Sequence, residues 1–202
     1  MKKDYRRYRA LYIFLRIVLF PFYRLKFIGR ENVPEGGAML CANHTSFLDP
    51  IFLAFALGIK HHPRFMGKAS LFRVPLVGRI YTAVGSFAVE RGKSDVTAVK
   101  TAMSYLKSGE KVVIYPEGTR VRGDSAVAAK QGAVRIADQM NVPVVPVHIP
   151  GDKHLFGRYT IVIGEPYFVN AEKTKLSGEE YLKRAEDLMD KIRALGQKAA
   201  KR

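Results

Sequence analysis

The sequence predicts an α/β fold in which a mostly parallel central sheet is flanked by helices. Short apolar runs alternate along the chain with stretches of helical periodicity, beginning at about Lys26. Such alternation is typical of a parallel sheet, because each crossover between strands places a helix on one face. The length of 202 residues and the hydrophobic fraction of 48% fit one domain with a substantial core.

Seven apolar stretches of strand length are the expected strands. In chain order they are Leu25–Ile28, Met39–Ala42, Arg64–Met66, Ser86–Val89, Val112–Tyr115, Val144–His148 and Thr160–Ile163. Helical spacing of apolar residues predicts helices at about 47–57, 76–83, 94–107, 130–139 and 178–195. The last of these is well marked, because Ser177 and Glu180 form a capping box and Gly196 follows the apolar stripe.

The segment 1–28 is basic and then apolar, and we expect residues 29–202 to form the α/β domain. The apolar residues of segment 1–28 recur at helical spacing, but they cover more of the helix surface than packing on one core requires. No uncharged run in this segment is longer than about seven residues, against ~18 for a spanning helix. Arg16 interrupts any signal-peptide core, and no small-residue cleavage site follows it. We favour an N-terminal amphipathic helix in the membrane interface; the alternative is a helix packed on its own domain.

The net charge of +16 is large for a protein of this length, and half of it lies in the first 30 residues. Such a field favours an anionic partner, either acidic lipid headgroups or nucleic acid. The single cysteine, Cys41, excludes an intramolecular disulfide and fits a reducing compartment. Because Cys41 lies inside an apolar strand, we expect a core residue and not a nucleophile.

His44 and Asp49 stand five positions apart, directly after the second expected strand. Five helical residues turn by about 500°, so these two side chains can meet only if the helix begins between them. We expect Thr45 or Ser46 to be the N-cap, with Asp49 in the first turn. An imidazole oriented by a carboxylate is a general base near neutral pH. The alternative is a plain capping motif beside an unrelated loop histidine.

Cations follow three other expected strands. Arg120 ends the loop that begins at Tyr115, Arg91 follows the fourth strand, and Lys68 follows the third. Ligands bind at the carboxyl ends of strands in open α/β sheets, and guanidinium groups suit a phosphate. Lys130 adds a cation near the start of the next helix, although Arg120 could instead pair with Glu117. We expect no metal site, because the other histidines do not stand at ligand spacing from carboxylates or the thiol.

Four of these stretches occur in a fixed order: Asn43-His44-x4-Asp49, Gly85 to Arg91, Tyr115 to Arg120, and Val142 to Pro146. Together they resemble the phospholipid and glycerol acyltransferase family, specifically its bacterial 1-acyl-glycerol-3-phosphate acyltransferases. The resemblance covers about residues 26 to 165.

The resemblance implies that His44 deprotonates an acceptor hydroxyl, which attacks an acyl thioester, while Asp49 holds the imidazole. It implies substrate-binding roles for Arg91, Glu117, Gly118, Thr119 and Arg120, and a weaker match carries the same role to Lys68 and Lys130. The expected partners are lysophosphatidate as acceptor, acyl-carrier protein or acyl-CoA as co-substrate, and anionic lipids on the cytoplasmic face of the cell membrane. No other cofactor is expected.

Two alternatives stay open at this point. The same chemistry could act on glycerol 3-phosphate or on another lysolipid. A non-catalytic basic protein that binds membrane or nucleic acid would explain the charge, but it gives no role to His44 and Asp49. We therefore expect lipid and no nucleic acid as the partner.

Overall fold

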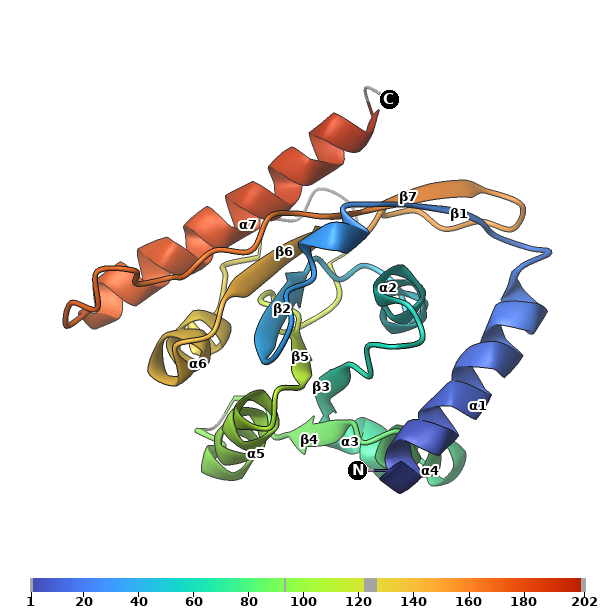
Figure 1. Ribbon diagram of the computed structural model, residues 1–202, viewed down its shortest axis with the longest axis horizontal. Helices are drawn as coiled ribbons and strands as arrows, with labels where there is room; N and C mark the ends of the chain where they lie inside the picture. The colour runs from blue at the N-terminus through green and yellow to red at the C-terminus, as the bar shows by residue number, and fades with distance from the viewer. Residues whose placement is uncertain (1, 93, 122–126, 201–202) are drawn as a thin grey trace.

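The computed structural model describes residues 2–92, 94–121 and 127–200. A seven-stranded sheet lies between two layers of helices, which confirms the predicted α/β fold (Figure 1). One layer consists of α5 (Val96–Lys107), α6 (Gly132–Met140) and α7 (Gly178–Ala200). The other contains α1 (Lys2–Leu19) and α2 (Asp49–Leu57), with α3 (Ala69–Phe72) and α4 (Pro75–Ala83) near the N-terminal end of α1.

The strands follow the order β1-β7-β6-β2-β5-β3-β4. Their bounds are β1 Arg24–Ile28, β2 Ala38–Ala42, β3 Arg64–Lys68, β4 Phe87–Val89, β5 Lys111–Ile114, β6 Val144–His148 and β7 Arg158–Ile163. Strand β2 pairs in parallel with both β5 and β6. Strand β7 is antiparallel to β6 and parallel to β1, so β1 and β7 run opposite to the rest.

The central strand β2 contributes to both halves of the core. All five of its residues are buried. Leu40 belongs to the same buried cluster as Phe52 of α2, whereas Met39 and Cys41 belong to the cluster that contains Leu188 of α7. Because alternate residues of a strand point to opposite faces, a strand between two helix layers must be apolar at every position. Cys41 is therefore a core residue, as its sequence context predicts.

All seven predicted strands and all five predicted helices are present, with shifted ends. Helix α2 begins at Asp49 and not at 47, and α5 begins at Val96 and not at 94. The sequence prediction missed α3 and the 3-10 turn Arg30–Asn32. Neither is long enough to show a helical repeat of apolar residues.

Helix α1 ends at Leu19, so the expected unit 1–28 is shorter as a helix than predicted. Residues 24–28 are β1 and belong to the sheet, because their backbone pairs with β7. The division of the chain at residue 28 as a domain boundary stays a prediction.

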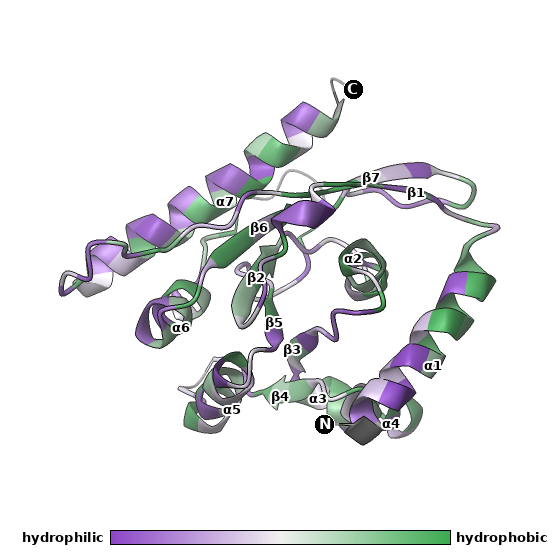
Figure 2. Ribbon diagram, in the orientation of Figure 1, coloured by the Kyte–Doolittle hydropathy of each residue, from purple (hydrophilic) through white to green (hydrophobic). Residues whose placement is uncertain are grey.

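The two faces of α1 differ. On the inner face, Tyr8 stacks on His62 with ring centroids 4.5 Å apart, and Tyr12 meets the edge of Phe55 at 5.2 Å. On the outer face, Phe14 and Ile17 are 60% and 69% exposed. The helix thus packs on the domain and also presents an apolar surface (Figure 2). Within the described chain, no helix has the length and apolar composition needed to cross a bilayer.

The fold brings the candidate residues to one edge of the sheet. His44 follows β2, Glu117 follows β5, Lys68 ends β3 and Arg91 follows β4. These four strands are neighbours and parallel, so their carboxyl ends meet at the same edge. Loops distant in the sequence are in this way combined into one site.

Candidate active site

His44 and Asp49 are hydrogen-bonded to each other, as their spacing predicts. The Nδ1–H group of His44 donates to Oδ2 of Asp49 at 2.8 Å. Asp49 is fully buried, and burial alone would raise its pKa. The hydrogen bond from His44 and the charge of Lys153 outweigh that effect, so the pKa of Asp49 lies below its usual value. Asp49 is therefore ionised at neutral pH and holds one tautomer of the imidazole.

The turn that precedes α2 differs from the expected cap. The N-cap is Leu48, whose side chain makes no capping bond, so the prediction of Thr45 or Ser46 as N-cap was wrong. Oδ2 of Asp49 accepts the backbone N–H groups of Thr45 and Ser46, both at 2.7 Å. These bonds close a turn over residues 45–48 and delay the first helical residue to Asp49. Pro50 then fits the first helical turn, where its missing N–H is not needed.

Tyr115 completes the support of the imidazole. Its ring stacks on that of His44, with centroids 4.1 Å apart and an interplanar angle of 18°. Nδ1 of His44 is engaged by Asp49, and no described residue forms a hydrogen bond with Nε2. The free nitrogen is thus the one that can exchange a proton with a substrate.

Glu117 fixes the backbone of the histidine loop. Its Oε1 accepts the backbone N–H of His44 at 3.0 Å, and the N–H of Val121 donates to the carbonyl oxygen of His44 at 2.8 Å. These bonds join the loops after β2 and β5. The carboxyl group thus faces His44 and does not form the alternative ion pair with Arg120. Burial raises the pKa of Glu117 to about 7.

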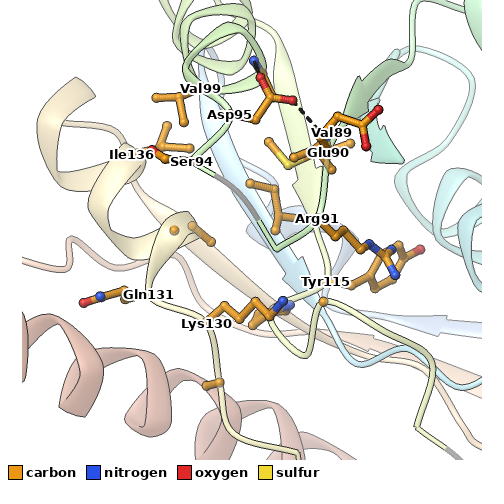
Figure 3. Close-up of a pocket in the computed structure, with 18 of the residues that line it drawn as sticks. Val89, Glu90, Arg91, Ser94, Asp95, Val99, Tyr115, Lys130, Gln131 and Ile136 are labelled. Carbon is orange, nitrogen blue, oxygen red and sulfur yellow. Dashed lines mark hydrogen bonds between the residues drawn. The ribbon is translucent and has the colours of Figure 1, made fainter. Parts of the chain in front are cut away.

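A cavity of about 480 Å³ opens beside this pair of loops. Two cations, Arg91 and Lys130, and two carboxylates, Glu90 and Asp95, line it together with Tyr115. Figure 3 shows that Arg91 and Lys130 both extend toward Tyr115. The inner wall is apolar and comes from β3, β5, α5 and α6. The cavity therefore combines charged side chains with an apolar inner wall, and both of its cations lie toward Tyr115.

Gly118 lets Lys130 reach the mouth of this cavity. A Cβ atom at position 118 would lie 2.7 Å from Cε of Lys130, and the backbone φ of +66° is itself unfavourable for other residues. The positive φ requires the glycine of the Tyr115–Arg120 loop for the turn, and its missing side chain leaves the space that Lys130 occupies.

The remaining predicted residues lie around this centre at different depths. The guanidinium of Arg120 stacks on Phe47, 3.5 Å from the ring centroid. Burial lowers the pKa of Arg91, and the charge of Arg120 lowers it further. The two guanidinium groups are therefore close enough to repel each other. Thr119 and Lys68 are exposed, and neither lines the cavity. The structure thus groups Arg91, Arg120 and Lys130, and leaves Thr119 and Lys68 at the rim.

Sequence reasoning missed a second, apolar cavity of about 340 Å³. It lies between α1, α2 and α4, and its wall includes Leu11, Tyr12, Phe47, Ile51 and Tyr81. Phe47, which carries the guanidinium of Arg120 on its ring, is therefore shared between the polar and apolar regions. The cavity has no local signal, because its walls come from three segments far apart in the sequence.

Comparison with known proteins identifies relatives of this chain. The model of the acyltransferase family matches residues 24–150. A 1-acyl-sn-glycerol-3-phosphate acyltransferase of Bacillus subtilis is 32% identical over 158 residues, which cover 75% of this chain and 78% of the relative. A chloroplastic 1-acyl-sn-glycerol-3-phosphate acyltransferase of Arabidopsis thaliana is 34% identical over 139 residues. That match covers 67% of this chain but only 38% of the plant protein.

A solved structure shares the fold. The 1-acyl-sn-glycerophosphate (LPA) acyltransferase PlsC of Thermotoga maritima superimposes with a TM-score of 0.71 and 26% sequence identity. The match covers 97% of this chain and 80% of the PlsC chain.

The raised pKa of Glu117 predicts an unusual pH dependence of stability. Its pKa of about 7 exceeds the ordinary value of 4.5, so the native protein binds this proton more tightly than the unfolded chain does. The associated stability is complete below about pH 4.5 and is lost as the pH rises through 7. Glu117→Gln should not show this loss. Between pH 5 and pH 8, we expect the unfolding free energy of wild type to fall by roughly 1–3 kcal/mol more than that of the variant. Urea unfolding at both pH values measures it.

The matched control is Glu172→Gln, at an exposed position. An identical change in unfolding free energy between pH 5 and pH 8 for wild type and Glu117→Gln would contradict this assignment.

Proposed function

The chain belongs to the acyltransferase family, and we propose that it transfers an acyl group from a thioester to the free hydroxyl of 1-acyl-glycerol 3-phosphate. The observation that carries the proposal is the His44 imidazole. It is oriented through Nδ1 by a buried carboxylate, no described residue forms a hydrogen bond with its Nε2, and Tyr115, which stacks on its ring, lines the cavity that holds Arg91 and Lys130. The names of the relatives support the choice of acceptor. The product of this reaction is phosphatidate.

In the proposed reaction, Nε2 of His44 accepts the proton of the acceptor hydroxyl while the hydroxyl oxygen bonds to the thioester carbonyl carbon. The carbon–sulfur bond then breaks, and the departing thiolate takes the proton from Nε2. Ionised Asp49 stabilises the imidazolium between these two steps. Because a thioester has a good leaving group, a positioned base and stabilisation of the oxyanion are sufficient.

We assign the acceptor phosphate to the cations at the sheet edge. Arg91 and Arg120 are close enough for one to lower the pKa of the other, and Lys130 extends into the same region. A phosphate placed between them would relieve their repulsion and accept charge-assisted hydrogen bonds. With the phosphate there, we place the glycerol hydroxyl at Nε2 of His44.

The acyl groups need apolar surface, which is offered by the inner wall of the cavity beside Tyr115 and by a second, apolar cavity. The cavity between α1, α2 and α4 has a volume of about 340 Å³ and borders on Phe47, three residues from His44. We assign one acyl chain to it. Acyl-carrier protein and acyl-CoA both present the same thioester, so either donor fits the chemistry at His44.

We place the protein on the cytoplasmic face of the cell membrane. The outer face of α1 exposes Phe14 and Ile17, and Phe20 continues it at 66% exposure. Arg6, Arg7 and Arg9 precede these residues and suit lipid phosphates. A lysophosphatidate acceptor and a phosphatidate product both reside in that membrane.

Removing the imidazole should abolish turnover while the protein remains folded. We expect His44→Ala to lower acceptor-dependent release of thiol from an acyl thioester by at least about 10²-fold, because general-base catalysis contributes roughly 10²–10⁴-fold. The assay compares wild type and variant with lysophosphatidate, with glycerol 3-phosphate and without acceptor, beside a thermal melt of each. Turnover of the folded variant within a few-fold of wild type would rule out the mechanism. Thiol release that does not depend on acceptor would indicate hydrolysis instead of acyl transfer.

Loss of Arg120 should weaken binding of the acceptor. A hydrogen bond to a charged group contributes about 1.5–3 kcal/mol, so we expect Arg120→Ala to raise the acceptor KM by roughly 10- to 100-fold. Initial rates across a lysophosphatidate series measure this. The control is Lys107→Ala, which removes one charge at the exposed end of α5. An unchanged acceptor KM in Arg120→Ala excludes the side chain from the phosphate site.

Charges on the outer face of α1 should release the protein from lipid. The double variant Phe14→Asp, Ile17→Asp removes two exposed apolar side chains, each worth about 1.5–3 kcal/mol when buried. We expect at least a roughly hundredfold lower partition onto phosphatidylglycerol vesicles, measured by co-sedimentation. Val96→Asp, at an exposed apolar position of α5, is the control. Equal partition of the double variant and wild type would show that α1 does not hold the membrane.

A further inference from the structure

A buried lysine lies behind the catalytic pair. Lys153 belongs to the connection between β6 and β7, and its side chain is only 1% exposed. Its Nζ lies 2.6 Å from Oδ1 of Asp49. Nothing in the local sequence around Lys153 indicates this contact, because Asp49 precedes it by about half the chain. A charged side chain is rarely buried without a specific partner.

The fold places this lysine through an amide bridge between two strand ends. Asn43 donates through Nδ2 to the carbonyl oxygen of Ile149 and accepts the N–H of Ile149 at Oδ1, both at 2.8 Å. This two-way bond joins the end of β2 to the end of β6. The residue after Asn43 is His44, and the turn after Ile149 leads to Lys153. The loop of the base and the loop of the lysine are thereby held side by side.

The ammonium group is fully satisfied in this position. Besides the ionic contact with Asp49, it donates to the carbonyl oxygens of Pro150 at 2.5 Å and Gly151 at 3.0 Å, and to Oγ1 of Thr45 at 3.2 Å. Its position is therefore set by four oxygen atoms. A side chain fixed in this way acts as part of the site and not as a mobile surface charge.

The two oxygen atoms of Asp49 have different partners. Oδ2 accepts from His44, Thr45 and Ser46, whereas Oδ1 faces Lys153. A buried carboxylate without a cation is costly and tends to take up a proton. A protonated Asp49 would no longer stabilise an imidazolium. The cation at Oδ1 opposes this protonation and leaves Oδ2 to the imidazole.

We propose that Lys153 is a positioning residue for acyl transfer, which keeps Asp49 ionised and aimed at Nδ1 of His44. This inference rests on the proposed function. Lys153 contacts the oxygen of Asp49 that the imidazole does not use, so its effect on the reaction passes through Asp49. The other titratable groups that face the pair are Tyr115 and Glu117 on the side of Asp49, and His148 on the side of Lys153.

The first test is the pH profile of Lys153→Met, which removes the charge and keeps the length of the side chain. We expect kcat to fall roughly tenfold or more at pH 7, with the acceptor KM within about twofold of wild type. The acid limb of kcat/KM should move to higher pH, because the coupled pair of Asp49 and His44 loses a nearby cation and binds protons more tightly. Lys107→Met, at an exposed site on α5, controls for loss of one lysine.

Two further experiments separate positioning from simple loss of packing. In an Asp49→Asn background, Lys153→Met should cost little additional activity, because the charge that it serves is already absent. In Lys153→Ala, methylammonium should restore part of the activity in a saturable way, whereas tetramethylammonium should not. An unchanged acid limb in Lys153→Met, or equal losses from this substitution with Asp or Asn at position 49, would overturn the proposal.

The proposal can also be tested if Lys153→Met folds poorly. If Lys153→Met is unstable because it strands the charge of Asp49, the double variant with Asp49→Asn should be more stable than Lys153→Met alone. A double variant that is no more stable overturns the proposal. Wild type without acceptor-dependent thiol release would defeat the proposed function itself. The stability comparison would still report the coupling of Lys153 and Asp49.

Discussion

The site depends on one oxygen atom, Oδ2 of Asp49. Three N–H groups converge on it, from the ring of His44 and the backbone of Thr45 and Ser46. These bonds set the orientation of the imidazole and the turn of the chain before α2 at the same time. The carboxylate lies in a fully buried position, where each bond is stronger than in water and a missing one would be costly. The same hydrogen bonds therefore determine both the orientation of the catalytic imidazole and the local fold before α2.

The sheet could be predicted because its signals are local and strong. An uninterrupted apolar run such as Ala38–Ala42 indicates a strand that is buried on both faces, and helical periodicity lies between such runs. The reversed direction of β7 was not predicted. The connection 149–157 is shorter than the dozen or more residues that a parallel crossover needs, so β7 can only return antiparallel to β6. The start of α2 was misplaced because side-chain bonds from Asp49 compete with helix formation over residues 45–48.

The sequence indicated the polar residues of the candidate site, but it did not indicate the contacts that these residues make across the sheet. The pairing of His44 with Asp49 followed from five-residue spacing, and the location of Arg91 and Arg120 followed from strand ends. Tyr115 stood in the sequence as a motif position without a role, and the stacking on His44 depends on the sheet that aligns β2 with β5. Glu117 was expected at the phosphate, whereas its hydrogen bond goes to the backbone of His44. Contacts made across the sheet leave no periodic trace along the chain.

The pairing of the first strand with the last has a consequence for synthesis. Arg24 of β1 lies opposite Arg158 of β7, so this edge of the sheet cannot form until about 134 further residues have been made. At about 5–20 residues per second, translation needs on the order of ten seconds for that length. For much of this interval α1, which precedes β1, is outside the ribosome while β7, the partner of β1, has not yet been made. A nascent chain of this design gains from meeting a lipid surface or a chaperone before its own fold is complete.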